Sequence, residues 1–425
     1  MALVVVVFVG ALLIGLPMAF VLGLGGLAHL ISINAPEYFP VITQRLFTGV
    51  NSFSLMCIPF FILAGELMNS GGITQRLLDF AREGLGWVKG GMAYCCVILA
   101  MVLSAILGSA NAVTAILCAI LIKEMAKDGY DSDFTGSLIA ASGVLGPIIP
   151  PSVTFIIYGV LTGVSVQKMF MAGIVPGIML GIGYILVILY YTKKRGYRKS
   201  KEKFEFNTFI KAFVKAIPAL IVPFVIIGGI MGGIFTPTES GAVAVVAAIV
   251  ASLIYRTFNV KDLPEILLRT GVTTAGIMLI VAFGNIMGWT LAMDGIPAKI
   301  TTGILSFTTN KYVVMLLIIV ALTIIGCLME AFSAMYIFTP VFFPLATAVG
   351  IDPIHFGIIY CVMLTIGLIT PPVGMLLFVT SNISKIPLAR LSKAIAPFAV
   401  SAIIVTLILA YCPALVMFIP NMLGI

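Results

Sequence analysis

Long apolar stretches alternate with short polar ones along nearly the whole chain. In each half, one apolar stretch long enough to cross a bilayer is interrupted by prolines and glycines, at Gly143–Ser152 and at Thr365–Gly374. Proline removes a backbone donor and clashes with the preceding turn, so neither stretch can remain a regular helix. A helix broken at membrane depth is tolerated only where it is buried in protein or lines a polar cavity. The sequence therefore predicts two broken membrane helices, one in each half.

Upstream of each break, two apolar arms are joined by a short polar tip. The arms are Met92–Leu107 and Val113–Ile122 in the first half, and Val313–Leu328 and Met335–Ala348 in the second. Each pair predicts a helical hairpin that enters the membrane and returns. Before the first hairpin, Ile73–Trp87 mixes apolar and charged residues as a helix lying at the membrane interface does.

The other apolar segments are expected to cross the membrane. They are residues 1–31, as one long span or as two short ones separated at Pro17, then Phe53–Met68, Phe170–Tyr191, Ala216–Gly233, Gly241–Tyr255, a span through Asp294, and Ile395–Ile419. Two connecting segments are expected between spans. Asn34–Asn51 is interpreted as a polar loop, and Lys261–Arg269 as an amphipathic segment that precedes the span through Asp294.

Composition assigns the chain to the integral membrane proteins. Of 425 residues, 61% are hydrophobic and 9% are charged, and the mean hydropathy is +1.20. A soluble domain carries about a quarter charged residues. No stretch alternates polar and apolar residues over about 10 residues as membrane β-barrels do, so the predicted fold is all-α. The N-terminal segment lacks the charged region and cleavage signature of a signal peptide and is expected to be retained.

The two halves form an internal repeat. A constant offset of 371 − 150 = 221 residues matches Pro150 with Pro371, and the same offset matches Gly146 with Gly367. We divide the chain into a first repeat at residues 1–192, a basic linker at residues 193–206 and a second repeat at residues 207–425. Paired interruptions in the two halves of an apolar chain indicate the binding site of a secondary transporter.

The distribution of basic residues predicts that the repeat is inverted. If Lys193–Lys203 is cytoplasmic, 20 of the 24 Lys and Arg residues lie inside and four lie outside, namely Arg45, Lys168, Lys299 and Lys311. This is the asymmetry that the positive-inside rule requires. The first hairpin then enters from the cytoplasm and the second enters from the outside.

Each hairpin tip is expected to face the broken helix of its own half, which gives two candidate sodium sites. Side-chain oxygens and the carbonyls at helix ends are suitable ligands for a hard cation. The candidate sodium ligands are Ser104, Ser109, Asn111, Gly143, Gly146 and Pro150 in the first half, and Gly326, Glu330, Ser333, Gly367 and Thr370 in the second. Half-helix N-termini after each Pro-Pro pair suit a carboxylate substrate. The candidate substrate residues are Ser109, Pro151, Ser152, Thr154, Pro372 and Gly374.

Structural roles stay open for the same residues. Serine, threonine and glycine also pack membrane helices together, and Glu330 can either serve the site or cap its own hairpin tip. Asp131 and Asp352 are interpreted as helix N-caps, and Glu239 as a first-turn acid that stabilises a helix start. The seven cysteines have no metal-ligand spacing. The sequence also lacks a phosphate-binding loop, an HExxH motif and a GxSxG motif, so neither an enzyme nor ATP-driven transport is expected.

Four stretches together resemble the large membrane subunit of the tripartite ATP-independent periplasmic (TRAP) transporters. They are Ile58–Met68, Gly146–Ser152, Phe235–Glu239 and Thr370–Gly374. The resemblance implies the fold of the ion-transporter superfamily and an elevator motion, in which the two re-entrant hairpins and the broken helices move together as a transport domain. It also places the sodium ligands at the hairpin tips and the helix breaks.

For function, the resemblance implies sodium-coupled import of an organic acid across the bacterial inner membrane, with Na⁺ as the coupling ion and no organic cofactor. The expected partners are a four-helix small membrane subunit and a periplasmic substrate-binding protein. We take sialic acid (N-acetylneuraminate) as the first candidate substrate, and dicarboxylates as the next. The alternative is a stand-alone carboxylate symporter or antiporter that needs no binding protein. A channel is a third class, disfavoured because mirrored hairpins imply alternating access.

Overall fold

The computed structural model describes residues 2–197, 199, 201 and 203–424. Over these residues the secondary structure consists of α-helices and three short 3₁₀ helices, and no β-strand is found. Seven helices are long and apolar enough to cross a membrane, or eight if two helices joined at a 45° bend count as one span. The prediction of an all-α, multi-pass membrane protein is therefore confirmed.

Ten α-helices make up the first half of the chain. They are α1 (Ala2–Leu13), α2 (Met18–Ser32), α3 (Phe39–Val50), α4 (Cys57–Ser70), α5 (Ile73–Leu85), α6 (Gly91–Leu107), α7 (Ala110–Lys127), α8 (Ser132–Gly143), α9 (Val153–Thr162) and α10 (Val166–Arg195). Two 3₁₀ helices, η1 (Pro36–Tyr38) and η2 (Phe53–Met56), precede α3 and α4.

The second half repeats this order of elements. Its helices are α11 (Phe206–Met231), α12 (Pro237–Ile254), η3 (Val260–Asp262), α13 (Leu263–Met293), α14 (Ile296–Phe307), α15 (Lys311–Leu328), α16 (Ala331–Ala348), α17 (Pro353–Gly367), α18 (Met375–Ser384), α19 (Leu388–Ala394), α20 (Ala396–Tyr411), α21 (Pro413–Val416) and α22 (Phe418–Met422). Hairpin α6–α7 corresponds to α15–α16, and the broken helix α8/α9 corresponds to α17/α18. Local detail repeats as well, since Gly72 before α5 and Gly295 before α14 are both left-handed, with φ of 61° and 64°.

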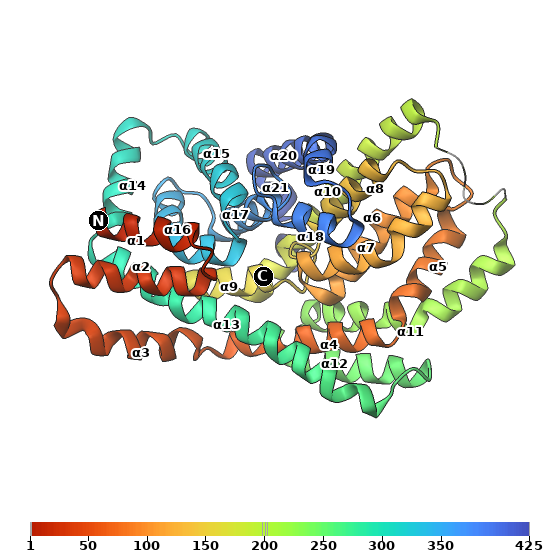
Figure 1. Ribbon diagram of the computed structural model, residues 1–425, viewed down its shortest axis with the longest axis horizontal. Helices are drawn as coiled ribbons and strands as arrows, with labels where there is room; N and C mark the ends of the chain where they lie inside the picture. Colours follow the sequence, from red (N-terminus) through yellow and green to blue (C-terminus); the bar gives the residue numbers. More distant parts are fainter. Residues whose placement is uncertain (1, 198, 200, 202, 425) are drawn as a thin grey trace.

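The hairpins and broken helices of the two halves interlock. Helix α7 packs against α8 of its own half and against α18 of the other, while α16 packs against α17 and α9. Figure 1 shows these elements above a row of helices, α3, α4, α12 and α13, that runs along one long edge of the molecule. Within that row α4 packs on α12, and α13 packs on α3. The two Pro-Pro peptide bonds of the breaks, Pro150–Pro151 and Pro371–Pro372, are both cis.

Two expectations about internal segments need correction. Asn34–Asn51 is not a polar loop, because it contains η1 and the 12-residue helix α3. Its apolar residues Phe39, Ile42, Leu46 and Val50 recur at helical spacing, and Pro40 lies in the first turn, where a missing N–H costs nothing. The amphipathic Lys261–Arg269 is not separate from the next span, since most of it belongs to the 31-residue helix α13.

Each of the two terminal segments expected to cross the membrane consists of more than one helix. The first 31 residues form two helices that are broken before Pro17, the second of the two arrangements considered. The last span ends at Tyr411 instead of continuing to Ile419. Pro413 opens the short helix α21 there, because proline cannot continue the hydrogen bonding of the preceding helix.

Candidate functional site

The tip of the first hairpin lies directly against the break of its own half. A Cβ atom placed on Gly146 would come within 2.8 Å of the carbonyl group of Ser109, and one on Gly108 would lie 2.6 Å from the carbonyl oxygen of Pro151. Side-chain contact begins only one turn further along, where a Cβ on Gly143 would meet the Thr114 hydroxyl at 1.9 Å. Tip and break therefore approach each other backbone to backbone, which glycine alone allows.

The second hairpin meets its own break in the same manner. A Cβ atom on Gly367 would lie 2.3 Å from the carbonyl carbon of Gly326, at the end of the first arm. The tip that follows is held by Glu330, whose carboxylate accepts hydrogen bonds from the backbone N–H of Phe332 at 3.0 Å and of Ser333 at 3.1 Å. Glu330 thus caps the N-terminus of α16.

The cap occupies only one side of the Glu330 carboxylate. Both backbone bonds, and a longer contact of 3.4 Å from the Ser333 hydroxyl, end on the same oxygen, Oε2. The hydrogen bonds of the described residues therefore leave Oε1 available to a ligand. The two roles considered for Glu330, cap and site residue, are compatible in this geometry.

A cavity of about 40 Å³ lies where the two tips and the two breaks converge. Its lining includes Ser109, Asn111 and Thr154 from the first half, and Glu330 and Met375 from the second. The Asn111 side-chain amide lies 3.6 Å from the Met375 sulfur, although the two residues are 264 positions apart. The tip of each half therefore adjoins the broken helix of the other half as well as its own. Both candidate sites border the same cavity.

Several predicted residues lie beside this cavity without lining it. The Ser104 hydroxyl donates to the Ala100 carbonyl at 2.6 Å, and the Thr370 hydroxyl donates to that of Ile366 at 2.9 Å, so each retains oxygen lone pairs but no free proton. Ser152 caps α9 by accepting from the Phe155 N–H at 3.2 Å. Its hydroxyl also donates to the Pro147 carbonyl, and the residue is buried.

The two breaks differ in exposure. Pro150 and Pro151 are buried, whereas Pro372 is exposed, and Gly374 is buried as the left-handed residue before α18. These four substrate- and ion-site candidates are not among the described residues that line the cavity. The predicted set is therefore split: residues of the tips line the cavity, and residues of the proline pairs shape the backbone behind it.

Sequence reasoning missed Thr114. Its side chain is fully buried beside Gly143, and within the described part of the chain its Oγ1 has no hydrogen-bond partner. A buried hydroxyl without a partner is uncommon and calls for a water or an ion. The available signal was its position four residues after Ala110, which places it one turn beyond the tip, on the same helix face.

The N-cap interpretation holds for one aspartate of the repeat and is wrong for the other. Asp352 accepts from the N–H groups of Ile354 and His355 at 2.8 and 3.0 Å. Asp131 makes no such bond, because its carboxylate lies 2.7 Å from Arg195 and 2.8 Å from the Tyr197 hydroxyl. A charge-assisted bond to arginine is stronger than a cap to a neutral N–H.

This cluster also shifts the ionisation of Asp131. Partial burial raises the pKa of the Asp131 carboxyl, but the hydrogen bonds from Tyr197 and Arg195 and the positive charge of Arg195 outweigh it, so the pKa lies below its usual value. Elsewhere, Glu239 forms a reciprocal capping box with Thr236 at the start of α12, as its first-turn position predicted. No group of three His, Cys, Asp or Glu side chains suited to a metal ion occurs in the described part of the chain.

Comparison with known proteins identifies the family. Residues 5–415 match the family model of the DctM component of the tripartite ATP-independent periplasmic transporters. Among curated relatives, the C4-dicarboxylate TRAP transporter large permease protein DctM of Pseudomonas aeruginosa is 36% identical over 95% of this chain and 94% of its own. The sialic acid TRAP transporter large permease protein SiaM of Vibrio cholerae is 35% identical, over 98% and 97% of the two chains.

A third relative and a solved structure extend the comparison. The 2,3-diketo-L-gulonate TRAP transporter large permease protein YiaN of Escherichia coli is 36% identical over 97% of this chain and 98% of its own. The crystal structure of the Alcanivorax borkumensis YdaH transporter superposes with a TM-score of 0.65 at 15% identity, covering 97% of this chain and 98% of that one, which shows a shared fold. The relatives are transporter permeases and not enzymes. This chain therefore belongs to the DctM family of TRAP transporter large permeases, as a multi-pass protein of the inner membrane.

Proposed function

We propose that this permease imports an organic acid by coupling it to the entry of Na⁺. The observation that carries this proposal is the convergence of both hairpin tips and both breaks on one cavity. Residues from two halves that meet at a single point can be exposed alternately to either side when the surrounding elements move. The proposed motion is an elevator, in which hairpins α6–α7 and α15–α16 and broken helices α8/α9 and α17/α18 form the moving part.

The proposed sodium sites are the two regions where a tip meets its own break. In the first half, the proposed ligands are the buried Thr114 oxygen beside Gly143, the predicted Ser104, Ser109 and Asn111, and the backbone of Gly143 and Gly146. In the second half, the proposed ligands are Oε1 of Glu330, the Ser333 hydroxyl and the backbone of Gly326 and Gly367, two glycines that are in direct contact. Oxygen donors at helix ends, where backbone carbonyls carry partial negative charge, suit a hard monovalent cation.

The substrate is proposed to bind in the cavity between the two sites, with its carboxylate near Ser109 and Thr154. A volume of about 40 Å³ has room for a few water molecules. It is far below the roughly 300–1,000 Å³ of pockets that hold small-molecule ligands. An organic acid therefore requires the tips to separate. Sialic acid is the first candidate and C4-dicarboxylates are the second, because relatives of similar identity carry each name.

The proposed partners are a small membrane subunit and a periplasmic binding protein that delivers the substrate. Family membership supports this arrangement, since the family is described as tripartite and periplasmic. The alternative remains a permease that takes substrate directly from solution. The two arrangements differ in which components transport requires.

The test is uptake of radiolabelled sialic acid into proteoliposomes under a fixed inward sodium gradient, with components added in turn. The proposal expects no uptake by this chain alone, none after adding the small subunit, and uptake once the matching binding protein is also present outside. Uptake by the chain alone would overturn the tripartite arrangement. Uptake of succinate but not of sialic acid by the complete system would replace the substrate and keep the mechanism.

A further inference from the structure

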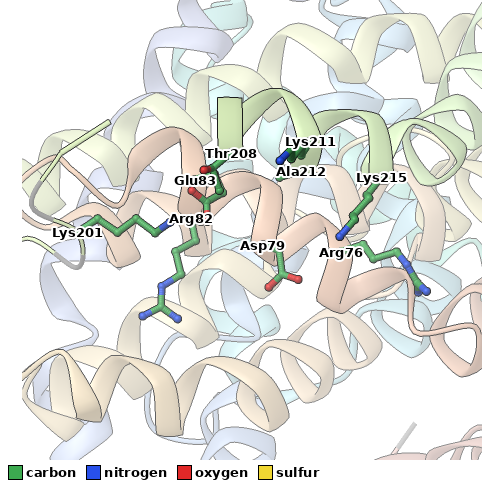
Figure 2. Close-up of a pocket in the computed structure, with 9 residues that line it drawn as sticks. All are labelled: Arg76, Asp79, Arg82, Glu83, Lys201, Thr208, Lys211, Ala212 and Lys215. Carbon is green, nitrogen blue, oxygen red and sulfur yellow. Dashed lines mark hydrogen bonds and ion pairs between the residues drawn. The ribbon is translucent and has the colours of Figure 1, made fainter. Parts of the chain in front are cut away.

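A charged cavity of about 380 Å³ lies between α5 and the beginning of α11 (Figure 2). It shares no lining residue with the cavity between the hairpin tips, so the transport site does not account for it. The cations in its lining are Arg76, Arg82, Lys201, Lys211 and Lys215, against the carboxylates of Asp79 and Glu83. The lining residues therefore carry 5 − 2 = 3 excess positive charges in all, and 3 − 2 = 1 without the two arginines, whose charged groups are engaged elsewhere.

Two of these cations are directed away from the cavity. Arg76 donates to the Gly72 carbonyl at 3.0 Å, and its guanidinium lies 4.1 Å from the centre of the Tyr255 ring. Arg82 lies 3.1 Å from Glu124 on α7. Figure 2 shows both guanidinium groups turned away from α11. These arginines fix the position of α5. The cations whose charged groups remain at the cavity are Lys201, Lys211 and Lys215.

Two lysines of α11 face the cavity, and neither has an anionic partner in the part of the chain that the structure describes. Lys201 pairs with Glu83 across the cavity. Lys211 and Lys215 are one helical turn apart, and over the described residues neither ammonium group lies within 4.0 Å of a carboxylate oxygen. Asp79, on the opposite wall, accepts a hydrogen bond from the Gln75 amide at 3.1 Å. Two ammonium groups therefore point into a cavity whose carboxylates are already engaged.

The surroundings place this cavity at the level of lipid head groups. Helix α5 is amphipathic and buries Ile73, Leu77 and Leu78 on its apolar face, as an interfacial helix does. Next to the cavity, the Phe80 ring of α5 packs at a tilt against those of Phe209 and Phe213 of α11, with ring centres 5.3 and 5.4 Å apart. Phenylalanine is a usual residue on the apolar face of an interfacial helix, and the positive-inside rule predicts the cytoplasmic side for an interface next to the basic linker before α11.

We propose that the cavity binds the phosphate of an anionic phospholipid from the cytoplasmic leaflet, with Lys211 and Lys215 as its main cations. Basic pockets between membrane helices on the cytoplasmic side are suited to such head groups. The bound lipid would connect α5, which leads into the first hairpin, to α11, which opens the second half. This inference is independent of the transported substrate and of the sodium sites.

The test measures lipid binding to the purified full-length chain in detergent by native mass spectrometry. The probes are phosphatidylglycerol, phosphatidylcholine and inorganic phosphate. The variant Lys211→Gln/Lys215→Gln removes two charges. Each lysine near a membrane surface strengthens the binding of an anionic head group about five- to sixfold, so the affinity for phosphatidylglycerol should fall about 30-fold. The matched control Lys193→Gln/Lys194→Gln removes two exposed charges from the end of α10 and should bind phosphatidylglycerol like the unchanged chain.

Two further comparisons test whether lost binding is due to lost charge and whether the site is specific for a lipid. Lys211→Arg/Lys215→Arg should retain binding, which separates lost charge from a folding defect. Phosphatidylcholine should bind weakly to every variant, and inorganic phosphate should not displace phosphatidylglycerol. Equal binding by the glutamine variant and the unchanged chain would overturn the proposal, as would an equal loss in the control. Displacement by inorganic phosphate at matched concentration would also overturn it, in favour of a site for free anions.

Discussion

The backbones of Gly326 and Gly367 are in direct contact, so closely that a Cβ atom on Gly367 would lie 2.3 Å from the carbonyl carbon of Gly326. Gly326 lies in the last turn of the first arm of the second hairpin, and Gly367 ends the first half of the second broken helix. No side chain separates the hairpin from the break. The geometry of the proposed ion site in this half therefore depends on two glycines.

Replacing Gly367 by alanine tests this contact. The added methyl group would meet rigid backbone, so we expect the hairpin to be displaced, with a stability loss of about 1–3 kcal/mol and loss of most uptake. Thermal unfolding in detergent and proteoliposome uptake measure the two effects. Gly276→Ala is the matched control, because Gly276 lies in membrane helix α13 with open space around its Cβ position. Equal behaviour of the two variants would contradict the contact.

Thr114→Val tests the proposed role of the buried hydroxyl in the first half. Valine preserves the shape of threonine and removes the oxygen, which has no hydrogen-bond partner among the described residues. Loss of a ligand to a charged group should raise the sodium concentration for half-maximal uptake about tenfold or more. Thr323→Val is the control, because Thr323 bonds the Ile319 carbonyl of its own helix at 2.8 Å. A sodium dependence unchanged by Thr114→Val would exclude Thr114 from the ion site.

Two substitutions separate the cap and ion roles of Glu330. Glutamine keeps an oxygen that can accept from Phe332 and Ser333, so Glu330→Gln should preserve thermal stability. Its lost charge should nevertheless weaken the sodium dependence of uptake. Glu330→Ala removes the cap as well and should lower both stability and uptake, the former by about 1 kcal/mol. Normal sodium-dependent uptake by Glu330→Gln would leave Glu330 with the cap role alone.

The Asp131 cluster predicts a pH-dependent contribution to stability. The pKa of Asp131 is lowered in the folded protein, so its stabilisation is complete above the unfolded value of about 3.9 and disappears as pH falls through the lower folded value. The Asp131 side chain is half-exposed, so the pair contributes less than about 1 kcal/mol.

This contribution can be measured as the difference in melting temperature between the unchanged chain and Asp131→Asn. The difference should be present at pH 7 and should vanish as the medium becomes strongly acidic. Tyr197→Phe, which removes one hydrogen bond and keeps Arg195, should reduce the difference only in part. A difference that stays the same across this pH range would show that Asp131 acts through packing instead of charge.

The breaks could be predicted because proline and glycine disrupt a helix through the backbone, whatever surrounds them. The hairpins could be predicted from paired apolar segments joined by a short polar tip. The repeat strengthened the prediction, since Pro150 and Pro371 fall at equivalent places. Helix α3 was missed because Pro36, Glu37, Pro40 and Arg45 together resemble a loop, although the apolar residues of α3 follow helical spacing.

Contacts between residues far apart in the sequence could not be predicted from local sequence patterns. Asn111 meets Met375 across 264 residues, and Asp131 meets Arg195 across 64, and no local pattern encodes either pair. Thr114 is one of many threonines in membrane helices, and only its burial beside Gly143 distinguishes it. Chain order thus predicted which elements meet at the cavity, and the fold determined which side chains line it.

The most direct test of the central claim is the dependence of uptake on the sodium gradient. Proteoliposomes holding this permease and its small subunit, with the binding protein outside, are given radiolabelled substrate with an inward sodium gradient, or with equal sodium on both sides. The account predicts accumulation in the first condition and only equilibration in the second. Equal accumulation under both conditions would contradict sodium coupling, and with it the two ion sites at the hairpin tips.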